Sequence, residues 1–181
     1  MYSRASTFCF LVFFFLFSSG FSQEKKAGPI VENHGKVWKI ENADIKVDTT
    51  KEYKVVFDIM DSPEDKNAVN AKIETAARFL NMHAQAGVPA ENLKAVLVVH
   101  NAASKDIILD TAYEKKYGAK NPNTSLMKEL LEANVKVIFC GQSSVSRDFP
   151  KEDLITGVQL SLSAMTALIQ LQDEGYRLIK F

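Results

Sequence analysis

Apolar residues gather in short runs along this chain, and segments with helical spacing separate these runs. Three runs rich in β-branched and aromatic residues predict buried strands, at residues 53–60, 93–99 and 135–140. The segment 176–181 alternates apolar and polar residues, which predicts a last strand at the edge of a sheet. Because strands as apolar as the first three are covered on both faces, we expect helices on each side of the sheet.

Helix start and stop signals lie between the predicted strands. Ser62 followed by Pro63 predicts the start of a helix that ends before Gly87. Ser104 is the expected cap of a second helix, which ends at Gly118. Two further helices are expected at 124–133 and 150–174, with a loop at 143–149. This order of elements predicts an α/β fold, a three-layer α/β/α sandwich with a mainly parallel sheet of four to five strands.

The first residues are typical of a secretory signal peptide. Arg4 supplies a positive start, residues 8–17 are almost all apolar, and small residues precede a cut after Ser22. The alternative is an uncleaved membrane anchor, for which the apolar run is short. We therefore expect a signal peptide at 1–22 and an exported protein, periplasmic or secreted. An N-terminal extension should follow at 23–50, as a hairpin or an edge strand, and then an α/β domain at 51–181.

Charge and cysteine content change once the signal peptide is removed. The remaining 159 residues hold 21 Lys and Arg against 22 Asp and Glu, without a basic block. This balance argues against nucleic acid or an anionic membrane surface as a partner. Cys9 leaves with the signal peptide, so Cys140 has no partner for a disulfide within the mature chain. A lone cysteine in an exported protein is either a buried, inert thiol or a reactive one.

The predicted topology suggests where chemistry takes place. Ligand sites in open parallel sheets lie beyond the carboxyl ends of the strands. Met60 or Asp61, His100 and Cys140 occupy such ends, so His100 and Cys140 should share one rim of the sheet.

A reactive thiol at this rim needs groups that stabilise its thiolate. The backbone N–H groups of 141–143 and a cation, His100 or Arg147, are the candidates. Gly141 leaves the sulfur approachable, and Gln142 and Ser143 can bind a ligand or only close the turn.

Other site motifs do not occur. The chain has no CxxC pair, no phosphate-binding glycine loop and no nucleophile elbow. Its three histidines and Cys140 lack metal-ligand spacing, so we expect no metal and no cofactor. Asn123 begins a glycosylation triplet of a kind that is common by chance.

Six short segments together carry a likeness to a known family. They are residues 53–58, 98–100, 121–123, 140–143, 163–168 and 175–176. In this combination the chain resembles the DsrE/DsrF-like family, in its exported branch with an N-terminal extension. The resemblance implies a three-layer domain that assembles as dimers, trimers or larger rings. It also implies that Cys140 carries a persulfide in a sulfur relay. The chain departs from the family at Asn101, where a glycine commonly follows the histidine, and in its expected export, because the relay members are cytoplasmic.

Three hypotheses about function follow. The first is an oligomeric periplasmic sulfur-handling protein, sulfurtransferase-like at most, in which Cys140 accepts a sulfane sulfur and His100 helps to stabilise the thiolate. Its partners would be a sulfur donor or acceptor protein, or a small sulfur species. The second is a binding module for a small ligand or a protein, with a structural Cys140. The third is an assembly role through the apolar last helix, around Leu160 and Leu168.

Overall fold

The computed structural model describes residues 23–181, and the predicted signal peptide with Cys9 lies outside them. Five parallel strands form one sheet with the order β4-β3-β2-β1-β5. The strands are β1 (Tyr53–Ile59), β2 (Leu93–Val99), β3 (Lys136–Cys140), β4 (Gln159–Ser161) and β5 (Arg177–Ile179). The α-helices are α1 (Ala71–Gln85), α2 (Asp110–Tyr117), α3 (Thr124–Glu132), α4 (Gly141–Arg147) and α5 (Ala164–Asp173). The predicted α/β fold with a parallel sheet is confirmed.

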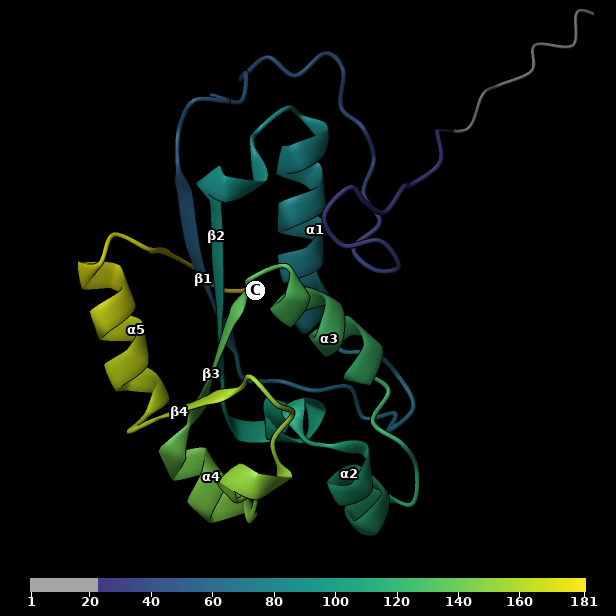
Figure 1. The fold of residues 1–181 in the computed structure, drawn as a ribbon, viewed down its shortest axis with the longest axis vertical. Helices are drawn as coiled ribbons and strands as arrows, with labels where there is room; N and C mark the ends of the chain where they lie inside the picture. The colour runs from purple at the N-terminus through teal and green to yellow at the C-terminus, as the bar shows by residue number, and fades with distance from the viewer. Residues whose placement is uncertain (1–22) are drawn as a thin grey trace, which may run out of the picture.

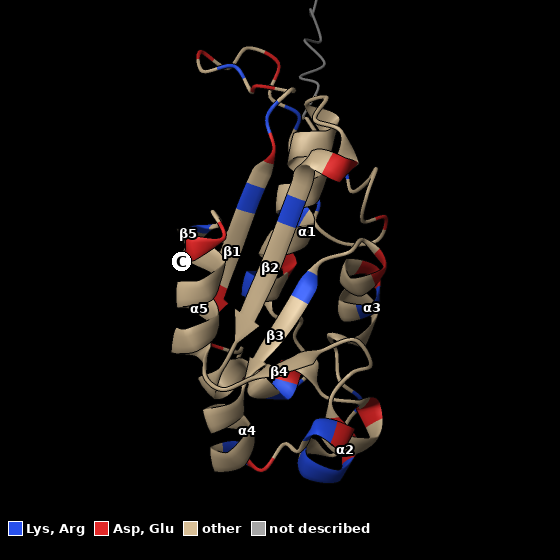
Figure 2. Ribbon diagram, turned by 60° about the vertical axis from the view of Figure 1, so that its left-hand side comes forward, with Lys and Arg blue, Asp and Glu red and all other residues tan. Residues whose placement is uncertain are grey.

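Helices cover both faces of the sheet, as the apolar strands require (Figure 1). Alternate residues of each strand point to opposite faces, so Phe57 and Leu97 lie in the larger core beneath α1 and α3. Val56, Val98 and Cys140 point the other way and pack against α5. Figure 2 shows the arrowheads of β1, β2 and β3 at one end of the sheet, beside α4. Cys140 therefore lies at the carboxyl rim, on the face that α5 covers.

The first helix begins later than its sequence signals predict. Its cap is Asn70, whose side chain accepts a hydrogen bond from the N–H of Lys72, so the predicted start at Ser62 is wrong. The hydroxyl of Ser62 instead donates to the buried carboxylate of Asp106, at 2.9 Å. A hydrogen bond from a distant part of the chain thus outweighs a local capping preference.

The predicted single helix over 150–174 is also wrong. Residues 159–161 form strand β4 at the free edge of β3, and the true helix α5 begins after Ser163, which caps it. Gly157 has a φ of 103°, a left-handed conformation that interrupts a helix. Because β4 is only three residues long, its apolar positions cannot be told from a helical stripe by spacing.

Two smaller expectations change near the rim. The segment predicted as a loop at 143–149 is mostly helix α4, which ends where Asp148 adopts a left-handed φ of 54°. The helix predicted from Ser104 to Gly118 is split into a 3₁₀ helix, Asn101–Ile107, and α2. The hydroxyl of Ser104 donates to the carbonyl oxygen of Asn101, at 2.6 Å, inside that 3₁₀ helix.

Residues 23–50 add no strand to the sheet, in contrast to the predicted hairpin or edge strand. Their one β-type pairing is an isolated antiparallel bridge between Lys26 and Val37. The side chain of Asn81 on α1, which is fully buried, holds this segment. It accepts from the N–H groups of Ile30 and Val31 and donates to the carbonyl oxygens of Val31, His34 and Gly35. The segment thus forms a strap across α1 and is called the N-terminal strap below.

No helix within residues 23–181 has both the length and the apolar character needed to cross a bilayer.

Candidate functional site

Cys140 is the last residue of β3, and α4 begins at the next residue. Only 5% of its surface is exposed, so its thiol lies almost entirely inside the rim. It is the only cysteine in the part of the chain that the structure describes. Its side chain packs with Val98 of β2 and Ala164 of α5. This position agrees with the sequence, which predicts Cys140 at a strand end.

Polar groups around the sulfur favour the thiolate. Burial by itself raises the pKa of the Cys140 thiol, because it penalises the charged form. The backbone N–H groups of Ser143, Ala164 and Gln142 and the hydroxyl of Ser143 outweigh this effect and lower the pKa below its ordinary value. Gln142 and Ser143 belong to the first turn of α4, whereas Ala164 is the first residue of α5. The sulfur therefore lies between the N-terminal ends of two helices, both of which favour negative charge.

Gly141 makes this approach of the two helices possible. A Cβ atom at Gly141 would lie 2.5 Å from the carbonyl oxygen of Ser161, which is closer than real Cβ contacts come. The side chain of Gln142 donates to the carbonyl oxygen of Leu162 and closes the same gap, at 3.3 Å. Glycine after the cysteine is therefore needed to bring the β4–α5 connection, and with it the N–H of Ala164, to the sulfur.

Sequence reasoning did not include Ala164 in the site, because it placed residues 150–174 in one uninterrupted helix. The serine at 163 followed by apolar spacing is the signal that would have indicated a second helix start.

His100 lies at the same rim but turns toward a different strand. Its Nε2 atom lies 2.7 Å from Oδ1 of Asp58 on β1. The order of the strands places β1 and β3 on opposite sides of β2, so the His100 ring reaches away from the strand that ends in Cys140. The donors that lower the Cys140 pKa are the groups named above. A direct role of His100 at the sulfur stays a prediction.

Asp58 on β1 is a further charged residue at the carboxyl rim, and the sequence did not single it out. Its side chain is 8% exposed and bridges His100 and Lys180, because Oδ2 also lies 2.8 Å from Nζ of Lys180. Burial raises the pKa of Asp58, but the hydrogen bonds from Lys180 and His100 outweigh it and lower that pKa. The same contact raises the pKa of Lys180. An acid inside the apolar run 53–60 was the available sequence signal.

Asn101, the departure from the family pattern, adopts the conformation for which glycine is usually needed. Its φ is 53°, a left-handed value that asparagine tolerates better than most residues. Its N–H donates to Oγ of Ser143, at 3.0 Å, and its side-chain oxygen accepts from Arg147. The side chain of Arg147 is therefore held by Asn101. Arg147 is one of the two cations that the sequence suggests as stabilisers of the thiolate, and in the structure it bonds the turn after β2.

Asp61, the other predicted rim residue, is exposed and forms an ion pair with Lys72 of α1. Asn123 of the glycosylation triplet is fully buried, and its side chain donates to Asp106 and Asn121. This asparagine therefore serves the internal hydrogen-bond network of the fold.

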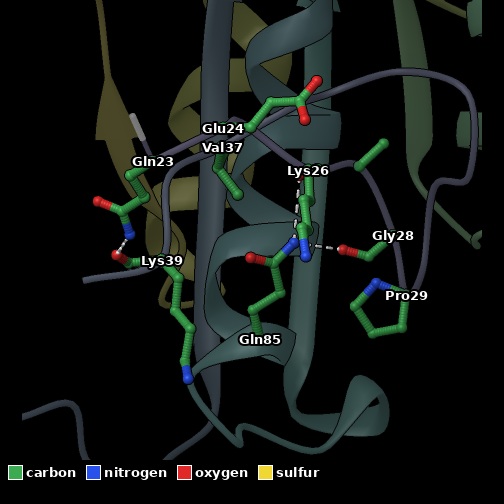
Figure 3. A pocket seen from close by; sticks show the side chains of 9 residues that line it. Gln23, Glu24, Lys26, Gly28, Pro29, Val37, Lys39 and Gln85 are labelled. Carbon is green, nitrogen blue, oxygen red and sulfur yellow. Dashed lines mark hydrogen bonds between the residues drawn. The ribbon is translucent and has the colours of Figure 1, made fainter. Parts of the chain in front are cut away.

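Several hollows of the described chain lie away from Cys140. One of about 590 Å³ lies between the N-terminal strap and Gln85 of α1 (Figure 3). In it the side-chain amide of Gln85 donates to the carbonyl oxygen of Gly28, at 2.7 Å. No three His, Cys, Asp or Glu side chains within residues 23–181 are grouped so that they could hold a metal ion.

Comparisons with known proteins agree with this architecture. The model of the DsrE/DsrF-like family matches residues 54–181. A protein of unknown function from Methanobacterium thermoautotrophicum, MTH1491, is similar in structure, with a TM-score of 0.54 and 19% identity, over 71% of this chain and 99% of that protein. The ychN protein from E. coli is similar with a TM-score of 0.51 and 18% identity, over the same shares of the two chains. These two likenesses concern the fold. No curated protein matches the sequence.

Proposed function

Because the chain belongs to the DsrE/DsrF-like family, we propose that it carries sulfane sulfur as a persulfide on Cys140. The observation that carries this proposal is the environment of the sulfur, which lies between two helix N-termini that lower the thiol pKa. A thiolate is the nucleophile that sulfur transfer requires. A carrier also needs no second cysteine nearby, since a resolving thiol would convert the persulfide into a disulfide.

Loading is a displacement at sulfur without net oxidation. The Cys140 thiolate attacks the outer sulfur of a donor persulfide or polysulfide and forms a new S–S bond to its own Sγ. The old S–S bond of the donor breaks, and its electron pair leaves with the donor thiolate. This step makes the protein a sulfur carrier. It would act as an enzyme only if it also passed the sulfur on to an acceptor, as a sulfurtransferase does. His100, whose ring bonds the carboxylate of Asp58, is assigned a supporting role at the rim.

The proposal includes export, with residues 1–22 as a signal peptide and the folded part acting in the periplasm or outside the cell. The apolar run 8–17 after Arg4 supports it. Detection of Gln23 as the first residue of the protein recovered from the periplasm would test it, and recovery of an intact Met1 chain would contradict it.

We also assign a homo-oligomer, formed through α5. Three large apolar side chains are exposed on or just before this helix: Leu162, Met165 and Ile169. Helix α5 carries one charged residue, Asp173, and Figure 2 shows it almost free of charge colours along its length. In a two-fold symmetric interface, the same patch of the two subunits packs against itself. A charged patch would then face its own like charges, whereas an uncharged patch avoids this repulsion. The N-terminal strap already covers α1 on the opposite face, which leaves the α5 face for a second copy.

Size-exclusion chromatography with light scattering tests the oligomer. Ile169→Glu places a charge in the patch and should shift the protein toward the monomer. Met82→Glu is the matched control, since Met82 is exposed on α1 at the other face and the change should leave the assembly intact. A monomeric wild-type protein at micromolar concentration would refute the assembly.

Mass spectrometry of the native protein after treatment with polysulfide tests sulfur carriage. The expected product is heavier by one sulfur atom, is lost on reduction and is absent from Cys140→Ser. Native wild-type protein that gains no sulfur, and resists iodoacetamide until unfolded, would refute the proposal.

The near-complete burial of Cys140 favours a second candidate, a binding module in which the thiol is structural. Under this candidate Cys140→Ser keeps ligand binding and cellular phenotype unchanged. Under sulfur carriage the same variant loses function while its circular dichroism spectrum stays that of the wild type.

A further inference from the structure

The carboxylate of Asp58 fixes which ring nitrogen of His100 carries a proton. Nε2 of His100 lies 2.7 Å from Oδ1 of Asp58, whose side chain is only 8% exposed. Burial raises the pKa of Asp58, but the hydrogen bonds from Lys180 and His100 lower it overall, so the carboxylate is ionised at neutral pH. An ionised carboxylate only accepts hydrogen bonds, so Nε2 is the donor. In the neutral ring, the lone pair that can take up a proton therefore lies on Nδ1.

The register of the strands places His100 next to Cys140. Val98 of β2 pairs with Ile138 of β3, and two residues further along these strands are His100 and Cys140. The N–H of His100 still donates to the carbonyl oxygen of Ile59 on β1, at 2.9 Å, and its backbone is extended. The alternation of β2 therefore continues, and His100 points to the same face as Val98 and Cys140. Because adjacent strands lie about 4.8 Å apart, the two residues are direct neighbours at the rim.

The ring of His100 nevertheless does not turn toward the sulfur of its neighbour. Nε2 reaches toward β1, and in an imidazole ring the bond between Cγ and Nδ1 lies opposite Nε2. Nδ1 is therefore on the side of the ring that faces away from Asp58, which is the side of β3. The His100 side chain is 23% exposed, so a molecule that approaches the rim can reach it. This position suits a base that serves a second sulfur, one that arrives beside Cys140 from outside.

We propose that His100, held by Asp58, is the base for the acceptor thiol that takes sulfur from Cys140, so that the site serves acceptors that are protonated at neutral pH. This inference rests on the proposed persulfide. In the release step Nδ1 takes the proton of the acceptor thiol while the acceptor sulfur attacks the outer sulfur of the persulfide. A new S–S bond forms, the bond between the outer sulfur and Sγ breaks, and its electron pair remains on Sγ. The ring passes its proton to water, the transferred sulfur keeps its own, and no oxidant or reductant is consumed.

The chemistry of thiols explains why such a base is useful. The thiolate is the nucleophile, yet a free thiol with a pKa of about 8.5 is mostly protonated at neutral pH. A base within reach of the attacking group contributes about a hundredfold or more to the rate. Asp58 is a positioning residue in this scheme, because it acts through the His100 ring. An amide in its place can donate to Nε2, which moves the ring proton to Nδ1 and removes the base.

Release to two different acceptors separates proton transfer from other effects. Mercaptoethanol must lose a proton when it attacks, whereas the sulfite dianion has none to lose. The full chain is loaded with polysulfide, and both release rates are measured at one slightly alkaline pH, where mercaptoethanol is still mostly protonated. His100→Gln keeps a side-chain N–H for Asp58 but has no base. It should slow release to mercaptoethanol by about a hundredfold and leave release to sulfite at the wild-type rate.

Two further variants test the role of Asp58. Asp58→Asn should show the same selective loss with mercaptoethanol. Lys180→Met is the matched control, because it removes the contact at Oδ2 of Asp58 and leaves Oδ1 bonded to His100. It should slow neither reaction. Circular dichroism reports the fold of each variant, and His100→Gln decides the role of the base by itself if Asp58→Asn does not fold.

Equal slowing with both acceptors in His100→Gln, or no slowing with mercaptoethanol, would overturn the inference. Wild-type rates in a folded Asp58→Asn would overturn the positioning role of Asp58. A wild-type protein that never forms the persulfide would overturn the proposed function instead. In that case, the same two acceptors applied to a mixed disulfide of Cys140 with mercaptoethanol still decide the role of His100, because they attack the outer sulfur of that disulfide in the same way.

Discussion

Asp58 offers the sharpest test of the polar contacts at the rim. It is a nearly buried carboxylate that bonds His100 on one side and Lys180 on the other. Asp58→Asn keeps the size of the side chain and removes its charge. The hydrogen bond to the partly buried His100 should be worth about 1.5–3 kcal/mol, as for bonds to charged groups. The bond to Lys180, which is 55% exposed, adds little because water screens it.

We therefore expect Asp58→Asn to lower the free energy of unfolding by about 1.5–3 kcal/mol at pH 7. Asp61→Asn is the matched control, since Asp61 lies three residues along the chain in an exposed ion pair with Lys72. Its loss should cost between about 0 and 1 kcal/mol. Urea unfolding followed by far-ultraviolet circular dichroism, with equal slopes required for the three proteins, measures both values.

The dependence on pH gives a second criterion for the same residue. The pKa of Asp58 is lowered in the folded state, so its stabilising effect is fully present above the pKa of an unfolded aspartate, about 3.9. The effect is lost as pH falls through the lower pKa of the folded state. The difference between wild type and Asp58→Asn should therefore be constant above about pH 5 and shrink below pH 4. Equal stability of Asp58→Asn and Asp61→Asn at pH 7, or a difference that remains undiminished at the lowest pH at which the fold persists, would refute this account.

Three other perturbations follow from single contacts. Gly141→Ala should lower the free energy of unfolding by about 1–3 kcal/mol, because its Cβ would meet the carbonyl oxygen of Ser161. It should also slow alkylation of Cys140 at neutral pH, and wild-type stability with wild-type alkylation would contradict both. Asn81→Ala removes the side chain that holds the N-terminal strap and should cost at least about 2 kcal/mol. Limited proteolysis should then cut within residues 28–37 while the rest stays intact, and wild-type resistance there would count against the strap. Alkylation of wild-type Cys140 should reach half its maximal rate at a lower pH than alkylation of the same thiol in the urea-unfolded protein, and an equal or higher midpoint in the folded protein would refute the lowered pKa.

The strands of the core could be predicted because local apolar pattern decides them. Residues 93–99 carry only one charged side chain, Lys94, and such a run is stable only inside a covered parallel sheet. Parallel strands also bring their carboxyl ends to one rim, which is why His100 and Cys140 were predicted at the same edge. The strand β4 was missed, because three residues do not contain enough of a period to distinguish a strand from a helix.

The partners of each polar side chain could not be predicted in the same way. Ser62 follows every local rule for a helix cap, yet its hydroxyl bonds the buried Asp106, forty-four residues along the chain. The sequence places His100 at a strand end, but only the structure shows that its ring bonds Asp58 on the neighbouring strand β1. Side-chain direction depends on which strands become neighbours, and the sequence does not state the strand order.

The sequence by itself determined an α/β protein with a parallel sheet and a lone cysteine at a strand end. Periodicity, composition and strand polarity are local properties that each segment carries with it. Only the tertiary structure decided that the sulfur lies between the N-termini of α4 and α5, and that His100 is held by Asp58. These contacts join residues that are far apart in the chain, and they exist only after the strand order and the close approach at Gly141 have brought the helices together.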